Sequence, residues 1–107
     1  MISDDIFVVY LTFADMDQAA AIGRVLVEEQ LVACINLLPG ATSLYHWDNA
    51  VRERQEVVAF AKTTADQFDA IVMRVQALHA YDTPCVVGWP LAQAAEAYAQ
   101  YVSVAVR

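Results

Sequence analysis

The sequence feature that most constrains the fold is the run of residues 33–47, in which two strand-like pieces are joined by Pro39-Gly40. Proline lacks the N–H that a β-ladder needs, and glycine can adopt the left-handed backbone of a bulge. We therefore expect one long strand that kinks at this point and continues. Beyond the kink, the alternation of side chains places Ser43, Tyr45 and Trp47 on one face of the strand.

A tight turn should follow this strand. Asp48-Asn49 is a pair of residues that tolerates φ > 0, and the next run, residues 51–63, again has the composition of a strand. The two strands and the turn together predict a long hairpin.

The other segments predict two helices packed on the same sheet and a third helix at the end of the chain. The predicted elements are a strand at Ile6–Phe13, a helix from the capping residue Asp15 to about Gln30, a helix after the capping pair Thr64 and Gln67 that ends around Leu78, a short strand at residues 85–89 and a helix over residues 92–102. Gly23 inside the first helix indicates a close approach of helix to sheet.

This order predicts a single α+β domain over residues 1–107, a ferredoxin-like βαββαβ sandwich with a long kinked hairpin and an extra C-terminal helix. Two helices would cover one face of the sheet. On the uncovered face we place Tyr45, Trp47, Val57, Ala59 and Ala61, which is more apolar surface than water tolerates.

Composition indicates that this surface meets other protein subunits. Hydrophobic residues make up 59% of the 107-residue chain, against about 45–50% in most globular proteins. No apolar run approaches the roughly 18 residues that span a bilayer, so we expect no membrane segment. The net charge of -7 disfavours nucleic acid binding. The opening residues 1–5 lack the basic and apolar regions of a signal peptide, which predicts a cytoplasmic protein with reduced, free thiols.

Three motifs give the chain a family resemblance. They are Ala33-Cys34-Ile35-Asn36, the run of residues 39–45 that begins with Pro39-Gly40, and Leu78-His79-x-Tyr81-x-x-Pro84. Together they closely resemble the divalent-ion tolerance (CutA) family. The resemblance implies a homotrimer whose sheets pack together around a threefold axis, with the long hairpin reaching across the neighbouring subunit.

The resemblance also implies a metal-binding role for His79, since this position of the family is linked to copper. A histidine at the end of a helix also forms hydrogen bonds with free carbonyl groups, so a structural role stays open. The thiols of Cys34 and Cys85 are further candidate metal ligands for soft ions, although a lone cysteine such as Cys34 is also a common core residue. These residues are scattered in sequence, so a site would have to be built by the fold or across subunits.

Glu56 and Lys62 share one face of the returning strand, because an even spacing separates them. They are expected either to line a cleft between subunits or to make structural hydrogen bonds and ion pairs.

Three function classes follow. The first is a non-enzymatic trimer that weakly binds copper or another divalent cation, since no sequence motif for covalent catalysis or phosphate binding is present. The second is a nucleotide or metabolite sensor of the PII type, in which Lys62, Arg24 or Arg74 would contact phosphates. The third is a trimeric scaffold that anchors another protein.

Overall fold

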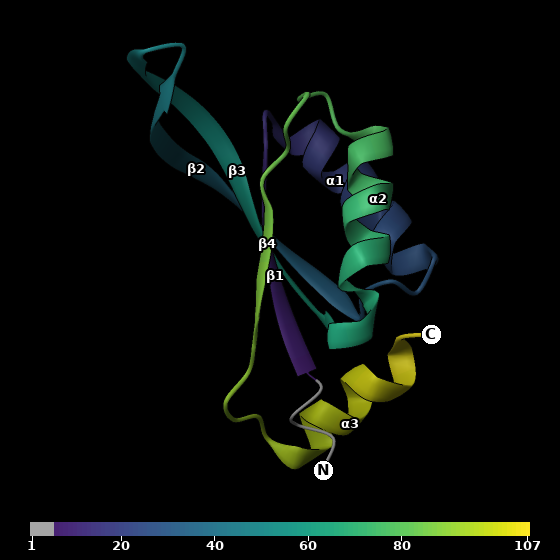
Figure 1. Ribbon diagram of the computed structural model, residues 1–107. Helices are drawn as coiled ribbons and strands as arrows, with labels where there is room; N and C mark the ends of the chain where they lie inside the picture. Colours follow the sequence, from purple (N-terminus) through teal and green to yellow (C-terminus); the bar gives the residue numbers. More distant parts are fainter. Residues whose placement is uncertain (1–5) are drawn as a thin grey trace.

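The computed structural model describes residues 6–107. Residues 1–5, on which the expected lack of a signal peptide depends, lie outside the described part. In chain order the elements are β1 (Ile6–Phe13), α1 (Met16–Glu28), β2 (Cys34–Trp47), β3 (Ala50–Thr64), the short 3₁₀ helix η2 (Ala65–Gln67), α2 (Phe68–Leu78), β4 (Val86–Pro90) and α3 (Glu96–Ala105). The strands form one antiparallel sheet in the order β2-β3-β1-β4, and α1 and α2 lie together on one of its faces (Figure 1). The predicted ferredoxin-like α+β order is confirmed.

The main core lies between the sheet and these two helices. It is built from the odd-numbered residues of β1 and β3, which pair across the two strands as Val9 with Ala61 and Phe13 with Val57. Ile71 and Val75 of α2 are fully buried against this layer. The stripe of apolar side chains predicted for the second helix therefore includes the residues that pack on the sheet.

The prediction that Val57, Ala59 and Ala61 lie on the uncovered face is wrong. Each is at most 4% exposed and belongs to the core beneath the helices. The reason is the parity of the hairpin: its two-residue turn sets Tyr45 opposite Arg52, so odd residues of β2 beyond the kink share a face with even residues of β3.

The face of the sheet away from α1 and α2, here called the open face, is nevertheless apolar. It carries Val8, Tyr10, Leu38, Val58, Phe60, Val87 and Trp89, as the strand registers show. Leu38, Val87 and Trp89 are 45%, 50% and 42% exposed. Such a face is typical of a surface that another protein layer covers.

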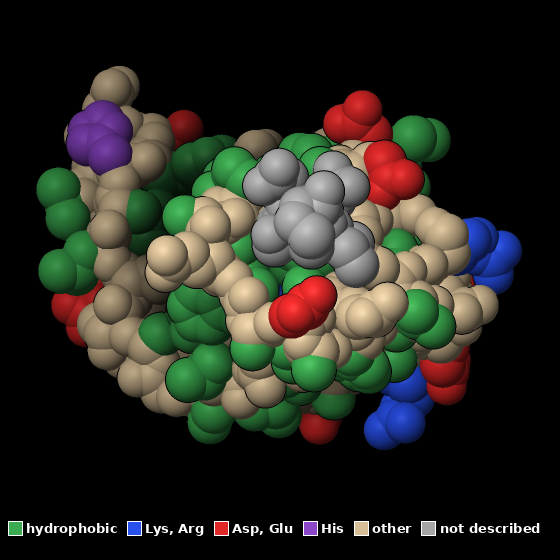
Figure 2. All heavy atoms as spheres, turned by 90° about the horizontal axis from the view of Figure 1, so that it is seen from below, with side chains coloured by type: hydrophobic (Ala, Val, Ile, Leu, Met, Phe, Trp, Pro, Cys, Tyr) green, Lys and Arg blue, Asp and Glu red, His purple; other side chains and the backbone are tan. Residues whose placement is uncertain are grey.

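The kink in β2 is a bulge at Pro39-Gly40. The register with β3 shifts between Leu38 and Ala41, and Gly40 has φ 88°. At the far end of the hairpin, Asp48 and Asn49 have φ of 51° and 61°, as expected for a tight two-residue turn. The part of the hairpin beyond the bulge, here called the arm, extends well past the other elements of the molecule, whose overall dimensions are 45 × 26 × 23 Å (Figure 1). Its side chains leave hydrophobic groups at the surface (Figure 2).

The helix ends follow the sequence in one case and depart from it in two. The Asp15 carboxylate accepts a hydrogen bond of 2.8 Å from the N–H of Gln18, which caps α1 as predicted. The predicted cap at Thr64 is wrong, because its hydroxyl donates to Asp66 and a 3₁₀ turn precedes α2. The third helix begins at Glu96 and not at residue 92, since Ala95 just before it has a non-helical ψ of 136°.

Glycines allow two close approaches in this fold. A Cβ at Gly23 would lie 3.2 Å from Cγ2 of Ile35, which confirms the predicted contact of α1 with the sheet. At Gly88 a Cβ would overlap the Phe7 ring and lie 2.9 Å from the carbonyl oxygen of Val8. Both positions therefore keep a helix or strand closer to its neighbour than a side chain would allow.

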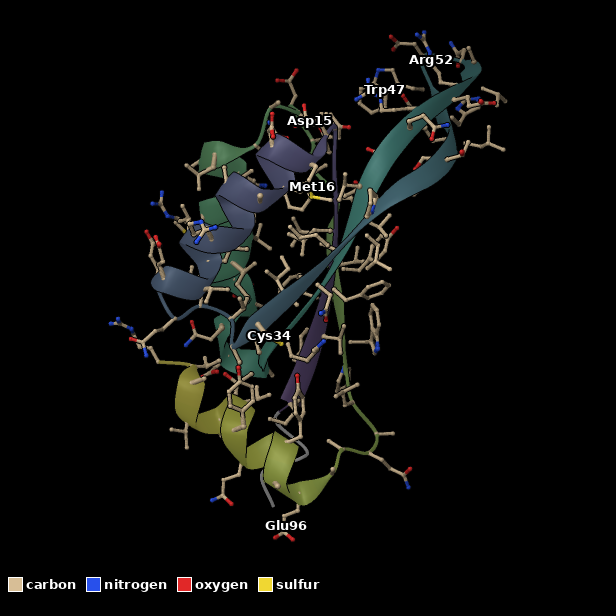
Figure 3. The ribbon with its side chains drawn as sticks, turned by 180° about the vertical axis from the view of Figure 1, so that it is seen from behind. Asp15, Met16, Cys34, Trp47, Arg52 and Glu96 are labelled. Carbon is tan, nitrogen blue, oxygen red and sulfur yellow. The ribbon has the colours of Figure 1, made fainter. Side chains whose placement is uncertain are left out.

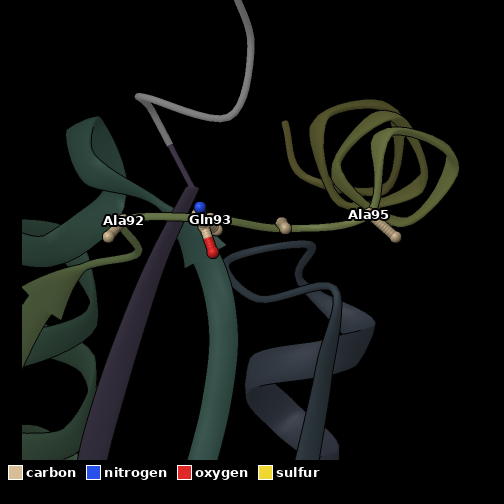
Figure 4. Close-up of a pocket in the computed structure, with 4 residues that line it drawn as sticks. Ala92, Gln93 and Ala95 are labelled. Atoms are coloured by element: carbon tan, nitrogen blue, oxygen red, sulfur yellow. The ribbon is translucent and has the colours of Figure 1, made fainter.

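Helix α3 closes one end of the sheet through a second, smaller core. Ala99, Val102 and Val106 pack there on Ile6 and Ala33. The extended segment before α3 borders an open hollow of about 570 Å³ lined by Ala92, Gln93, Ala94 and Ala95, with one polar side chain (Figure 4). Among the described residues, no helix has the length and apolar character needed to cross a membrane.

Candidate functional site

The densest group of polar side chains lies where the arm leaves the sheet, and we call it the Glu56 cluster: Ser43, Arg54, Glu56 and Tyr81. The Ser43 hydroxyl donates to Oε1 of Glu56 at 2.7 Å, and the Tyr81 hydroxyl donates to Oε2 at 2.7 Å. One carboxylate thus joins β2, β3 and the loop after α2. Because both of its oxygens accept short hydrogen bonds, the Glu56 side chain is held in one orientation.

Arg54 completes this cluster from the arm. Its guanidinium carbon lies 4.9 Å from the centre of the Tyr81 ring, a cation–π geometry. Burial, and then the hydrogen bond to Glu56, raise the pKa of the Tyr81 hydroxyl above its ordinary value. Tyr81 therefore stays a neutral donor at physiological pH and keeps Glu56 as its acceptor.

His79 lies directly behind this cluster and uses both ring nitrogens. Nδ1 accepts a hydrogen bond of 3.0 Å from the N–H of Tyr81, so Nε2 carries the proton and donates to the carbonyl oxygen of Thr12 at 2.8 Å. The ring also stacks on Phe13, with centroids 5.2 Å apart. His79 thus positions the Tyr81 loop against β1, and either nitrogen would have to lose a hydrogen bond before it could bind a metal.

Cys85 lies at the same end of the sheet, just before β4. Burial and the negative charge of Glu56 raise the pKa of the Cys85 thiol. The pKa of Tyr10 is raised by burial and by the nearby Cys85 and Glu56. The structure therefore brings Cys85 and His79 to one region. The side chain of Glu56, from β3, lies in the same region and binds Tyr81 of their loop.

Cys34 lies at the opposite end of the sheet, beside α3 (Figure 3). In the strand register Cys34 of β2 lies opposite Lys62 of β3, and Lys62 lies opposite Val8 of β1. Thr12, the partner of His79, is four residues further along β1, or about 13 Å at the rise of a strand. The Cys34 sulfur instead contacts the Tyr98 hydroxyl at 3.3 Å. The three predicted metal ligands are therefore not brought together within one chain.

The residues within a single chain do not fit a chelating metal centre. Among residues 6–107, no group of three or more His, Cys, Asp or Glu side chains is close enough to hold an ion. The acidic side chains visible from one side of the molecule are scattered over its surface (Figure 2). A stable site of three or four protein ligands would require donors from a second chain.

Glu56 and Lys62 share a face, as expected, but have separate partners. Lys62 donates to Oδ1 of Asn36 at 2.7 Å, whereas Glu56 binds Ser43 and Tyr81. They do not form an ion pair, since six residues of strand separate them by about 20 Å. The structural alternative given for these two residues fits this arrangement.

Sequence reasoning missed Ser43 and Arg54 as members of the Glu56 cluster. Ser43 pairs with Arg54 across the hairpin. The sequence contained the information needed for this pairing. Counting outward along both strands from the two-residue turn Asp48-Asn49 places Ser43 opposite Arg54. The role of Tyr81 depends on the loop after α2, whose path the sequence does not specify.

The cations that a phosphate-binding sensor would need are also apart. Arg74 binds Glu29 through both of its carboxylate oxygens, at 2.9 and 2.7 Å, within the helix layer. Arg24 borders a groove of about 300 Å³ between α1 and β2. Lys62 lies on the open face, on the other side of the sheet. This arrangement does not favour the sensor alternative.

Comparison with known proteins gives one consistent result. The model of the family described as CutA1 divalent ion tolerance protein matches residues 7–105. The divalent-cation tolerance protein CutA of Thermus thermophilus is 40% identical over 95 residues, which cover 89% of this chain and 92% of that protein. Protein CutA of Homo sapiens is 33% identical over 93 residues, but these cover only 52% of its length.

Solved structures agree with the sequence comparison. The structure of the divalent cation tolerance protein from Thermus thermophilus superimposes with a TM-score of 0.93 at 37% identity, covering 95% of this chain and 99% of that one. CutA1 of Oryza sativa gives a TM-score of 0.95 at 28% identity, with 100% and 98% covered. The resemblance carried by the three motifs is thereby confirmed, and the chain belongs to the CutA1 divalent ion tolerance protein family.

Proposed function

We propose that this protein is a non-enzymatic homotrimer that takes part in tolerance of divalent cations and binds copper or another divalent ion weakly. The observation that carries the proposal is the family match over residues 7–105. The net charge of -7 supports it, because an acidic surface raises the local concentration of cations. Its cytoplasmic location stays a prediction.

The trimer is supported by the apolar open face. Val87 and Trp89 are about half exposed there, and the arm projects from the same sheet. A second and third copy would cover this surface without any change in the fold.

The positions of the candidate ligands support weak metal binding. His79 has to exchange a hydrogen bond for a metal bond, and Cys85 has to lose a proton from a thiol whose pKa is raised. Glu56 already accepts two hydrogen bonds. Metal binding therefore competes with the contacts that hold the Tyr81 loop.

Native mass spectrometry during titration with Cu(II), Zn(II) and Cu(I) tests the proposal, because it reports subunit number and bound metal together. We expect a trimer whose metal occupancy falls at least tenfold in His79→Ala and falls in Cys85→Ser. His46→Ala is the matched control, since His46 is an exposed histidine on the arm.

Equal occupancy in His79→Ala and His46→Ala would remove His79 from the proposed site. A trimer that stays free of metal at every concentration would contradict metal binding while leaving the assembly intact. A monomer would contradict the trimer.

A further inference from the structure

The structure leaves one group of side chains that the Glu56 cluster and the proposed metal site do not use. It lies at the α3 end of the open face, and we call it the Lys62 cluster: Cys34, Asn36, Lys62 and Tyr98. Lys62 is the only lysine in the chain. Its side chain is half-buried.

The Lys62 ammonium has no carboxylate partner among residues 6–107. The one salt bridge found there joins Arg74 and Glu29. Within this described range Lys62 shares the lack of a carboxylate partner with the arginines other than Arg74, but its side chain is half-buried, and a partly buried charge without a counter-charge is costly. The carboxylate of Glu56, on the same face, lies about 20 Å away along the strand and is held by its own hydrogen bonds.

The cluster has more hydrogen-bond donors than acceptors. Lys62 has three N–H groups and uses one on Oδ1 of Asn36. An ammonium can only donate, so this contact fixes the Asn36 amide with its oxygen toward Lys62 and leaves its two N–H groups for other acceptors. Cys34 and Tyr98 share one hydrogen bond although each carries a hydrogen. Several donors therefore remain for a ligand that only accepts.

The surroundings of the cluster strengthen its attraction for a negative charge. Lys62 lies in a row across the sheet that continues through Val8 to Trp89. Val8 is 7% exposed and Trp89 is 42% exposed, so the ammonium stands beside an apolar floor. An ion pair is stronger in such a setting than in bulk water.

We propose that the Lys62 cluster binds a carboxylate or a similar small oxyanion at the α3 end of the open face. Lys62 supplies the charge, while Asn36 and the Cys34–Tyr98 pair supply further donors. The oxyanion comes either from a free small molecule or from an Asp or Glu side chain of a second copy of the chain. The site does not depend on metal binding.

The unique lysine makes a direct test possible. Protein grown with isotope-labelled lysine gives side-chain NMR signals from Lys62 alone. Acetate, citrate and phosphate are added in turn, with chloride at the same ionic strength as the control. If the oxyanion is a free molecule, the Lys62 signals shift in a saturable manner with one of these anions and not with chloride, and Asn36→Ala weakens the binding at least threefold.

The second source is tested by assembly. Lys62→Met and Arg24→Met each remove one positive charge, but Arg24 lies in the helix layer. If a second copy supplies the carboxylate, the assembled fraction in native mass spectrometry falls at least tenfold in Lys62→Met and not in Arg24→Met, with circular dichroism unchanged. If no anion shifts the Lys62 signals and the two variants assemble equally, the proposal is overturned.

Discussion

His79 belongs to a recognisable motif, but in this structure its ring has a structural role: it forms hydrogen bonds with two backbone groups. Its tautomer is set by a backbone donor on one side and a backbone acceptor on the other. The motif His79-x-Tyr81 therefore encodes a loop closure: the histidine holds the amide of Tyr81, and the Tyr81 hydroxyl reaches Glu56. Any ligand role of His79 is coupled to the position of that loop.

Tyr98 offers a prediction at the scale of single residues. Its hydrogen bond with Cys34, together with burial, raises the pKa of Tyr98 to about 12. The folded pKa is above the unfolded value, so this contribution to stability is complete below the ordinary tyrosine pKa and is lost as pH rises through about 12. Cys34→Ala removes the first cause, and we expect one tyrosine to ionise at lower pH.

Absorbance of tyrosinate during an alkaline titration measures this shift. Tyr98→Phe identifies the tyrosine, because it deletes the step that Cys34→Ala moves. Superimposable curves for the wild type and Cys34→Ala would show that the thiol has no influence on Tyr98.

At the scale of elements, the two helix starts after β1 and β3 differ although their sequences look alike. Asp15 with Gln18 and Thr64 with Gln67 both have the spacing of a capping box, yet only Asp15 caps a helix. Asp66 competes for the Thr64 hydroxyl at 2.5 Å, and the chain makes a 3₁₀ turn before α2 begins. The spacing of a capping box is therefore not sufficient to fix where a helix begins.

This difference predicts unequal effects of two substitutions. We expect Asp15→Ala to lower the free energy of unfolding by about 1 kcal/mol per chain. Thr64→Ala should cost less than about 0.5 kcal/mol, because it removes only an exposed local hydrogen bond. Urea unfolding at one fixed protein concentration compares them, and Asp15→Asn, which keeps an acceptor, should restore most of the loss. Equal losses for Asp15→Ala and Thr64→Ala would contradict the assignment.

The parts of the fold that could be predicted are those that depend only on residues close together in the sequence. Strand β1, the bulge at Pro39-Gly40 and the turn at Asp48-Asn49 follow from local chemistry and are confirmed. The face occupied by Val57 could not be read from its apolar character, because apolar residues lie on both sides of this sheet. The Glu56 cluster depends on three separate elements, so its geometry requires the tertiary structure.

At the scale of the whole molecule, the open face determines how the chain meets its copies. Val87 is 50% exposed on this face, in the edge strand β4, while Val104 is 78% exposed on α3. A charge at Val87 would be buried on assembly, whereas a charge at Val104 would stay near water if the open face is the interface. We therefore expect Val87→Glu to dissociate the proposed trimer and Val104→Glu to leave it intact.

Native mass spectrometry and sedimentation measure this effect, with circular dichroism as the control for folding. An intact trimer in Val87→Glu would place the interface elsewhere. Dissociation of both variants would show that the effect is not specific to the open face.

The bulge in β2 also separates the direction of the arm from the faces that its side chains occupy, which are linked in most strands. Between Leu38 and Ala41 the strand advances three residues while β3 advances two, from Val58 to Glu56. Removing Gly40 alone would leave a two-residue step on both strands. Every later side chain of β2 would then keep its partner on β3 and its face of the sheet. The arm could then be straightened by a single deletion without exchanging its inner and outer surfaces, which makes its direction a property that evolution or design can adjust independently of its sequence pattern.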